Sequence, residues 1–210
     1  MALRLYAIPR STNVERVAFA MAHKGLEAEV VMLDPADREP VVDVSGQPLV
    51  PVLEDDGWVV ADSSEIIEHL ERRFPEPALF PAATAARAEL RVFVDWFNRV
   101  WKRPPNELAE ELERPQPDAA RMLALAAEMR ASLDLFEALL DGRDHLFGPF
   151  SAADCCAFPF LKYAGGIDPA DGELFHRVLA ERLALDGAHP LLAAWIERVD
   201  RRPRLAGVVV

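Results

Sequence analysis

Two adjacent hydroxyl residues, Ser11 and Thr12, lie where an apolar run gives way to a helical pattern, and Asn13 follows them. A hydroxyl at the start of a helix can cap it, because the oxygen accepts hydrogen bonds from exposed backbone N–H groups. The same hydroxyl can donate to an anion, and a helix N-terminus stabilises a nearby negative charge by about 0.3–1 kcal/mol. Two interpretations are therefore open for Ser11: a simple cap, or the donor to a reactive group that the chain itself lacks.

The elements around these residues predict a small mixed sheet with helices packed on it. Short apolar runs at 3–9 and 27–35 flank a helix whose apolar residues have the spacing i, i+3, i+4 and i+7, namely Val14, Val17, Ala18 and Met21. Residues 49–62 predict two strands joined by the turn-forming "EDDG", and 63–77 predict a helix. The order β-α-β followed by β-β-α is typical of an α/β domain.

The second half of the chain predicts helices only. A helix over 83–103 should stop at Pro104 and Pro105, and a second should end at Gly142. The expected helices after the first cover 117–141, a segment from Ser151, a segment near Glu173, and 189–203. The spacing of Ser151 and Asp154 predicts a capping box at the start of the segment from Ser151. On the helix expected over 83–103, Trp96 lies at the edge of the apolar stripe, so it faces the rim of the core, a cleft or a partner subunit.

Composition excludes several classes of function. A net charge of −12 argues against a general nucleic-acid binder, which needs a basic surface. No apolar run approaches the ~20 residues of a membrane span, and the N-terminus lacks the apolar core of a signal peptide, so we expect a cytoplasmic protein. The five histidines have no metal-ligand spacing, and the two cysteines, Cys155 and Cys156, are adjacent. No metal site is therefore expected.

Four segments, in this order, resemble the serine-type glutathione transferases, that is, the theta, zeta and tau classes and their bacterial relatives. They are "LYAIPRSTNVERVAFAMAHKGL", "LVPVLEDDG", "ADSSEIIEHL" and "FGPFSAADCCAF". The resemblance implies a thioredoxin-like α/β domain at 1–78, a linker at 79–84 and an all-α helical-bundle domain at 85–210. It also implies glutathione as co-substrate and a homodimer.

By this resemblance Ser11 stands at the catalytic hydroxyl, with Thr12 as a second donor. The thiol of glutathione has an ordinary pKa of about 8.5, and only the thiolate is the nucleophile. Lowering that pKa to ~6.5 requires ~2.7 kcal/mol. A hydrogen bond to a charged sulfur supplies ~1.5–3 kcal/mol and the helix N-terminus ~0.3–1 kcal/mol. A serine cannot form the mixed disulfide that a cysteine would, so addition or substitution is favoured over thiol-disulfide exchange.

The other implied glutathione contacts have structural alternatives. Val50 and Pro51 match a Val-Pro whose peptide bond is cis, so that the Val50 backbone pairs with the cysteinyl part of glutathione; the alternative is an ordinary trans proline at a strand start. Asp62 would accept the ligand's ammonium and Ser63 would bind its α-carboxylate, or Asp62 only caps a helix. Asn13 is expected beside glutathione.

The resemblance leaves the electrophile and one subsite open. Arg10 and Trp96 are expected in the pocket for a hydrophobic electrophile, in a cleft between the domains. The glycyl carboxylate has no assured cation, and the candidates are Arg10, Lys24, Arg38 and the neutral Gln47. Two alternatives to a transferase are a glutathione-dependent cis-trans isomerase of the zeta kind and a non-catalytic binding protein with this fold.

Overall fold

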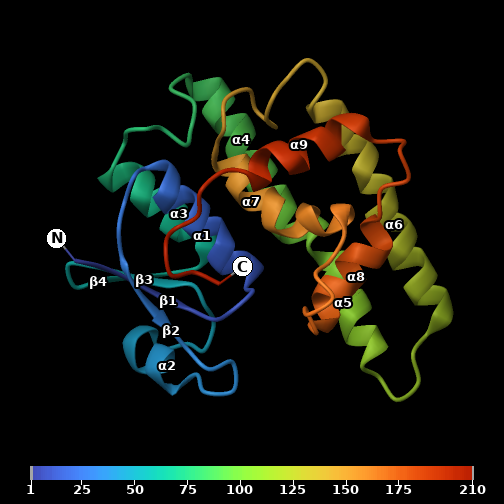
Figure 1. The fold of residues 1–210 in the computed structure, drawn as a ribbon, viewed down its shortest axis with the longest axis horizontal. Coiled ribbons are helices and arrows are strands. Elements are labelled where there is room, and N and C mark those ends of the chain that lie inside the picture. The colour runs from blue at the N-terminus through green and yellow to red at the C-terminus, as the bar shows by residue number, and fades with distance from the viewer. Residues whose placement is uncertain (1, 210) are drawn as a thin grey trace. The chain divides into compact units, whose positions relative to one another are not determined.

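The structure is a computed structural model that describes residues 2–209. The chain separates into two compact units (Figure 1). The first unit contains the residues up to Ala83 together with the tail from Arg202, and the second contains Thr84–Arg201. The helices of the described residues include none that is both long enough and apolar enough to cross a membrane.

The first unit is the expected α/β domain. Its elements are β1 (Leu3–Ala7), α1 (Thr12–His23), β2 (Glu29–Met32), α2 (Glu39–Ser45), β3 (Val52–Asp55), β4 (Trp58–Ala61) and α3 (Ser63–Arg73). The sheet order is β2-β1-β3-β4, with β1 parallel to β2 and antiparallel to β3, and β4 antiparallel to β3. Figure 1 shows α1 and α3 side by side, with α2 across the strands from them. This arrangement confirms the thioredoxin-like fold class.

Helix α2 was not expected from the sequence. It begins with Pro40 in its first turn and ends at Gly46, whose φ of 74° is the left-handed conformation that glycine adopts easily. Of its residues only Val41 is buried. A helix of 7 residues that buries one side chain offers only a short apolar pattern, too short to predict a helix.

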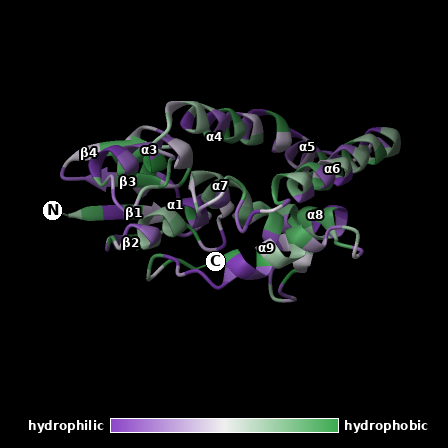
Figure 2. Ribbon diagram, turned by 90° about the horizontal axis from the view of Figure 1, so that it is seen from above, coloured by the Kyte–Doolittle hydropathy of each residue, from purple (hydrophilic) through white to green (hydrophobic). Residues whose placement is uncertain are grey.

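The second unit contains helices only, as expected. They are α4 (Thr84–Trp96), a π-helical turn (Phe97–Trp101), α5 (Arg103–Leu112), α6 (Ala119–Leu139), α7 (Ala152–Leu161), a 3-10 turn (Lys162–Gly165), α8 (Leu174–Leu183) and α9 (Pro190–Asp200). Figure 2 shows that α4 carries both hydrophilic and hydrophobic residues around its turns.

The prediction for Pro104 and Pro105 was wrong. The α-helical form of the expected 83–103 helix ends at Trp96, and the two prolines lie in the first turn of α5 rather than in a loop. Proline is tolerated there because the first turn has no intrahelical acceptor for its N–H. The path from α4 to α5 is continued by the π-helical turn (Phe97–Trp101).

The predicted capping box at Ser151 is confirmed. Ser151 is the N-cap of α7, and its backbone N–H donates to Asp154 Oδ2 at 2.9 Å. The indole of Trp195 donates to Asp154 Oδ1 at 2.9 Å, so the box also ties α7 to α9. Complete burial raises the pKa of the Asp154 carboxyl above its ordinary value, and the donors around it act in the opposite direction.

The tail from Arg202 packs on the first unit, whereas the sequence assigned it to a domain at 85–210. Arg204 Nη2 pairs with the buried Glu15 at 3.1 Å, and the N–H of Leu205 donates to the carbonyl of Ala18 at 3.0 Å. The backbone N–H of Arg10 donates to the carbonyl of Val209 at 2.7 Å. The last residues therefore support α1 and the loop that precedes Ser11.

Candidate functional site

Ser11 is the N-cap of α1. Its backbone is extended, with φ −71° and ψ 117°, and its Oγ accepts a hydrogen bond from the N–H of Val14 at 3.3 Å. The capping interpretation is therefore correct. Capping uses only a lone pair of the oxygen, so the hydroxyl hydrogen of this half-buried residue is left to donate to another group.

The residues beside Ser11 differ in exposure. Thr12 is the first residue of α1 and only 8% exposed, whereas Asn13 is half-buried. Arg10 has a φ of 57°, a left-handed conformation that is uncommon for a residue other than glycine. The backbone turns sharply at Arg10, and Ser11 comes next at the helix start. Ser11 is thus the more accessible of the two hydroxyl residues.

The Val50–Pro51 peptide bond is cis, which confirms that expectation. Val50 is half-buried and lies just before β3, the strand that pairs with β1. The pairing of its backbone with a cysteinyl group stays a prediction.

Asp62 and Ser63 begin α3. Asp62 is exposed, with a φ of 74°, and its Oδ1 accepts from the N–H groups of Ser64 at 2.8 Å and Glu65 at 3.3 Å. Ser63 is buried, and its Oγ accepts a hydrogen bond from Arg16 Nη1 at 3.3 Å. The capping interpretation of Asp62 is confirmed, and a cap does not exclude ligand binding, because a capping carboxylate keeps further lone pairs.

Three of the four candidates for a glycyl carboxylate have partners elsewhere. The Lys24 ammonium is fully buried and donates to Glu71 Oε2 at 2.8 Å. The Gln47 amide bonds within its own loop, to Ser45 Oγ at 3.1 Å and to the backbone of Leu49. Arg38 Nε donates to the carbonyl of Pro35, 3.0 Å away. The sequence could not show these partners, because a charged residue looks the same whether paired or solvated.

Trp96 lies on an apolar groove of the second unit. The groove has a volume of about 520 Å³ and is lined by α4, α6 and Phe147. Trp96 contacts the Phe93 ring with centroids 5.8 Å apart, and the neighbouring Val92 is 69% exposed. Four other aromatic residues of the second unit are buried in the core, namely Phe97, Trp101, Phe158 and Tyr163. The contact of Trp96 with an electrophile stays a prediction.

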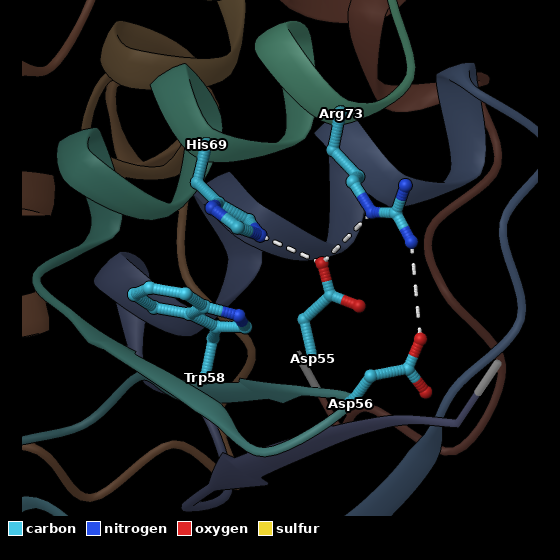
Figure 3. Close-up of a pocket in the computed structure, with 5 residues that line it drawn as sticks. All are labelled: Asp55, Asp56, Trp58, His69 and Arg73. Atoms are coloured by element: carbon cyan, nitrogen blue, oxygen red, sulfur yellow. Dashed lines mark hydrogen bonds and ion pairs between the residues drawn. The ribbon is translucent and has the colours of Figure 1, made fainter.

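A second cavity, of about 360 Å³, lies on the first unit where the β3–β4 hairpin meets α3 (Figure 3). His69 Nε2 lies 2.8 Å from Asp55 Oδ2, and Arg73 Nε lies 3.7 Å from the same oxygen. Trp58 and Asp56 complete the lining, which has no hydroxyl or thiol. The sequence did not single out these residues. The Asp55–His69 contact fastens the hairpin to α3 and has no nucleophile beside it.

The described residues contain no group of three or more histidine, cysteine or carboxylate side chains placed to hold a metal ion. Cys155 and Cys156 are buried in α7.

Two family models match nearly the whole chain. Residues 5–78 match "Glutathione S-transferase, N-terminal domain", and 81–198 match "Glutathione S-transferase, C-terminal domain". The chain belongs to the glutathione S-transferase family. The crystal structure of a glutathione S-transferase from Rhodospirillum rubrum F11 is similar at 31% identity and a TM-score of 0.73, covering 96% of this chain and 89% of that one.

Other relatives in the glutathione S-transferase family have more specialised names. Protein LigF of Sphingobium sp. is 28% identical, covering 98% of this chain and 92% of LigF. The crystal structure entitled "Beta-etherase LigF" is similar with a TM-score of 0.77 and 25% identity, covering 97% of this chain and 96% of that one. A maleylacetoacetate isomerase of Pseudomonas aeruginosa is 35% identical over 42% of this chain and 45% of its own. The family is thus shown, and the relatives differ in reaction.

Proposed function

We propose that this glutathione S-transferase family member conjugates the thiolate of glutathione to a small hydrophobic electrophile, with Ser11 as the catalytic donor. The observation that carries the proposal is the position of Ser11: its oxygen caps α1 while its hydrogen is left to donate. A sulfur bound at that point receives both the hydrogen bond of the hydroxyl and the positive potential of the helix N-terminus.

These two effects are large enough for the task. The hydrogen bond to a charged group contributes ~1.5–3 kcal/mol, and the helix N-terminus ~0.3–1 kcal/mol. Their sum covers the ~2.7 kcal/mol that separates a thiol pKa of ~8.5 from ~6.5. The thiolate is only a few per cent of free glutathione at neutral pH, and it becomes the major form of the bound glutathione. No general base is then needed to generate it.

The remaining residues of the proposed site hold the tripeptide. The Val50 backbone, beside the cis Pro51, pairs with the cysteinyl residue. Asp62 accepts the ammonium of the γ-glutamyl residue, and Ser63 donates to its α-carboxylate. Asn13 borders the cysteinyl sulfur, with Thr12 as the second donor. With the ends fixed, the sulfur is held beside Ser11.

The reaction is a nucleophilic attack. The thiolate electron pair forms a C–S bond, and in a substitution the leaving group departs with the electrons of the bond that breaks. In an addition the electrons move to the acceptor, which then takes a proton from solvent. Ser11 stabilises the thiolate and has no thiol with which to form a mixed disulfide. We propose Arg10 and Trp96 as the residues that contact the electrophile.

A second candidate is a glutathione-dependent isomerase, in which the same thiolate adds to a cis double bond and leaves after rotation. The match to the maleylacetoacetate isomerase favours it. A non-catalytic glutathione-binding protein is the alternative outside catalysis. We also propose a homodimer in the cytoplasm, as is typical of the family, with its assembly measured by analytical ultracentrifugation.

The experiment combines a glutathione-affinity resin with three turnover assays, using an activated aryl chloride, a β-aryl ether and a maleyl-type cis alkene. Retention together with conjugation of either of the first two electrophiles supports the transferase. Retention with isomerisation alone supports the isomerase, and retention without turnover supports a binding protein. Failure to bind glutathione contradicts the proposed function altogether.

A further inference from the structure

Arg16 is a guanidinium buried next to the start of α3. It lies in the second turn of α1, its residue is 1% exposed, and its Nη1 donates to Ser63 Oγ at 3.3 Å. Helices α1 and α3 pack against each other within the first unit. Burying a guanidinium costs several kcal/mol unless its charge and donors are engaged, so its partners indicate its role.

The contact fixes the direction in which Ser63 donates. Arginine has donors only, so the Ser63 oxygen is the acceptor and its own hydrogen must point elsewhere. Ser63 is also the first residue of α3, whose backbone N–H has no intrahelical acceptor. Asp62 takes the N–H groups of Ser64 and Glu65. Among the described residues, the hydroxyl hydrogen and the backbone N–H of Ser63 have no acceptor.

Two donors with a cation behind them form a site for one carboxylate. The N–H and O–H of Ser63 lie at a helix N-terminus, where an anion is favoured. The positive charge of Arg16 is held within hydrogen-bond distance of that hydroxyl, in a buried setting where a charge acts more strongly than in water. A hydroxyl that accepts from a cation is also a stronger donor, because hydrogen bonds in a chain polarise one another.

We propose that Arg16 is a positioning residue for the glutathione carboxylate at α3: it orients the Ser63 hydroxyl and supplies the charge that balances the α-carboxylate of the γ-glutamyl group. This inference rests on the proposed function and extends it to a residue that does not touch the ligand. Loss of Arg16 lets the Ser63 hydroxyl turn and removes the balancing charge. We expect about tenfold weaker glutathione binding, a change of the size that one charge-assisted hydrogen bond supports.

The test measures dissociation constants by isothermal titration for the wild type, Arg16→Met, Arg16→Lys and Ser63→Ala. The ligands are glutathione and 4-aminobutanoyl-cysteinylglycine, which lacks only the α-carboxylate of the γ-glutamyl residue. Arg72→Met is the matched control, because Arg72 is an exposed arginine in the last turn of α3. Circular dichroism verifies that each variant is folded, and Arg16→Lys, which keeps a charge and a donor, serves if Arg16→Met does not fold.

We expect Arg16→Met to weaken the binding of glutathione about tenfold and the binding of the analogue less than about twofold. Arg16→Lys should recover part of the lost affinity. In turnover assays of Arg16→Met, KM for glutathione should rise more than kcat falls. In a Ser63→Ala background the effect of Arg16→Met should shrink. If Arg16→Met weakens the binding of both ligands equally, or of neither, the positioning role of Arg16 is overturned while glutathione binding stands. A wild type that binds no glutathione overturns the proposed function as well.

Discussion

Replacing Lys24 with methionine should strongly destabilise the first unit. The Lys24 ammonium donates to Glu71 Oε2 at 2.8 Å, to the carbonyl of Phe74 at 2.7 Å and to that of Pro77 at 3.0 Å. Methionine has a similar length and no donor, so the buried Glu71 carboxylate loses this cation and two carbonyls lose a donor. Breaking a buried ion pair by removing one partner costs about 3–5 kcal/mol. For a chain of this size that corresponds to a fall in Tm of roughly 6–20 °C.

The assay is denaturant unfolding followed by circular dichroism, for Lys24→Met, Glu71→Gln, the double variant and the exposed control Arg72→Met. We expect the double variant to lose less unfolding free energy than the two single variants lose together, because neutralising both groups removes the uncompensated charge. A loss below about 1 kcal/mol for Lys24→Met, or strict additivity in the double variant, would refute the structural role assigned to this pair.

Three further changes test other parts of the structure. The His23 ring accepts from Arg202 Nη2 at 3.1 Å, and its burial lowers its pKa below the ordinary 6.5. The unfolded chain therefore binds the proton more readily, so the free energy of unfolding should fall as pH drops below about 6.5. Denaturant midpoints of wild type and His23→Gln, measured across that pH range, test this dependence. A parallel decline of the midpoint in both proteins is the contrary result. Ser151→Ala removes the cap of α7 and should cost about 1–2 kcal/mol in unfolding free energy, with an unchanged midpoint as the contrary result. Asp62→Asn keeps a capping oxygen but loses the charge, so glutathione affinity measured by titration should fall about tenfold with little change in stability; equal affinity would remove Asp62 from the ammonium site.

The sequence predicted those elements whose residues repeat with a clear period or carry a strong stop signal. The periodic residues of α1 and the Ser151 capping box were both correctly interpreted, because each signal is local. Helix α2 was missed because its residues are mostly exposed. Pro104 and Pro105 misled because proline both ends a helix and begins one, and only the geometry decides which.

The buried charges near the site could not be predicted in the same way. Arg16 and Glu15 lie on a helix with a recognisable apolar face, and polar residues there are normally solvated. Their partners are distant in sequence: Ser63 is 47 residues from Arg16, and Arg204 is 189 residues from Glu15. Such pairs form only when the fold brings the segments together. Ser11 and Asp62 could be predicted as helix caps because a capping residue is recognised from the few residues around a helix start.

The most direct test of the central claim is the titration of the bound thiol. Ultraviolet absorbance of the thiolate, recorded across pH with saturating glutathione, gives the apparent pKa in wild type and in Ser11→Ala. We expect a wild-type pKa of about 6.5 and a rise of about 1–2 pKa units in Ser11→Ala, which is the hydrogen-bond energy of ~1.5–3 kcal/mol expressed as a pKa. The same value in both proteins, or a wild-type value equal to that of glutathione in solution, would contradict it.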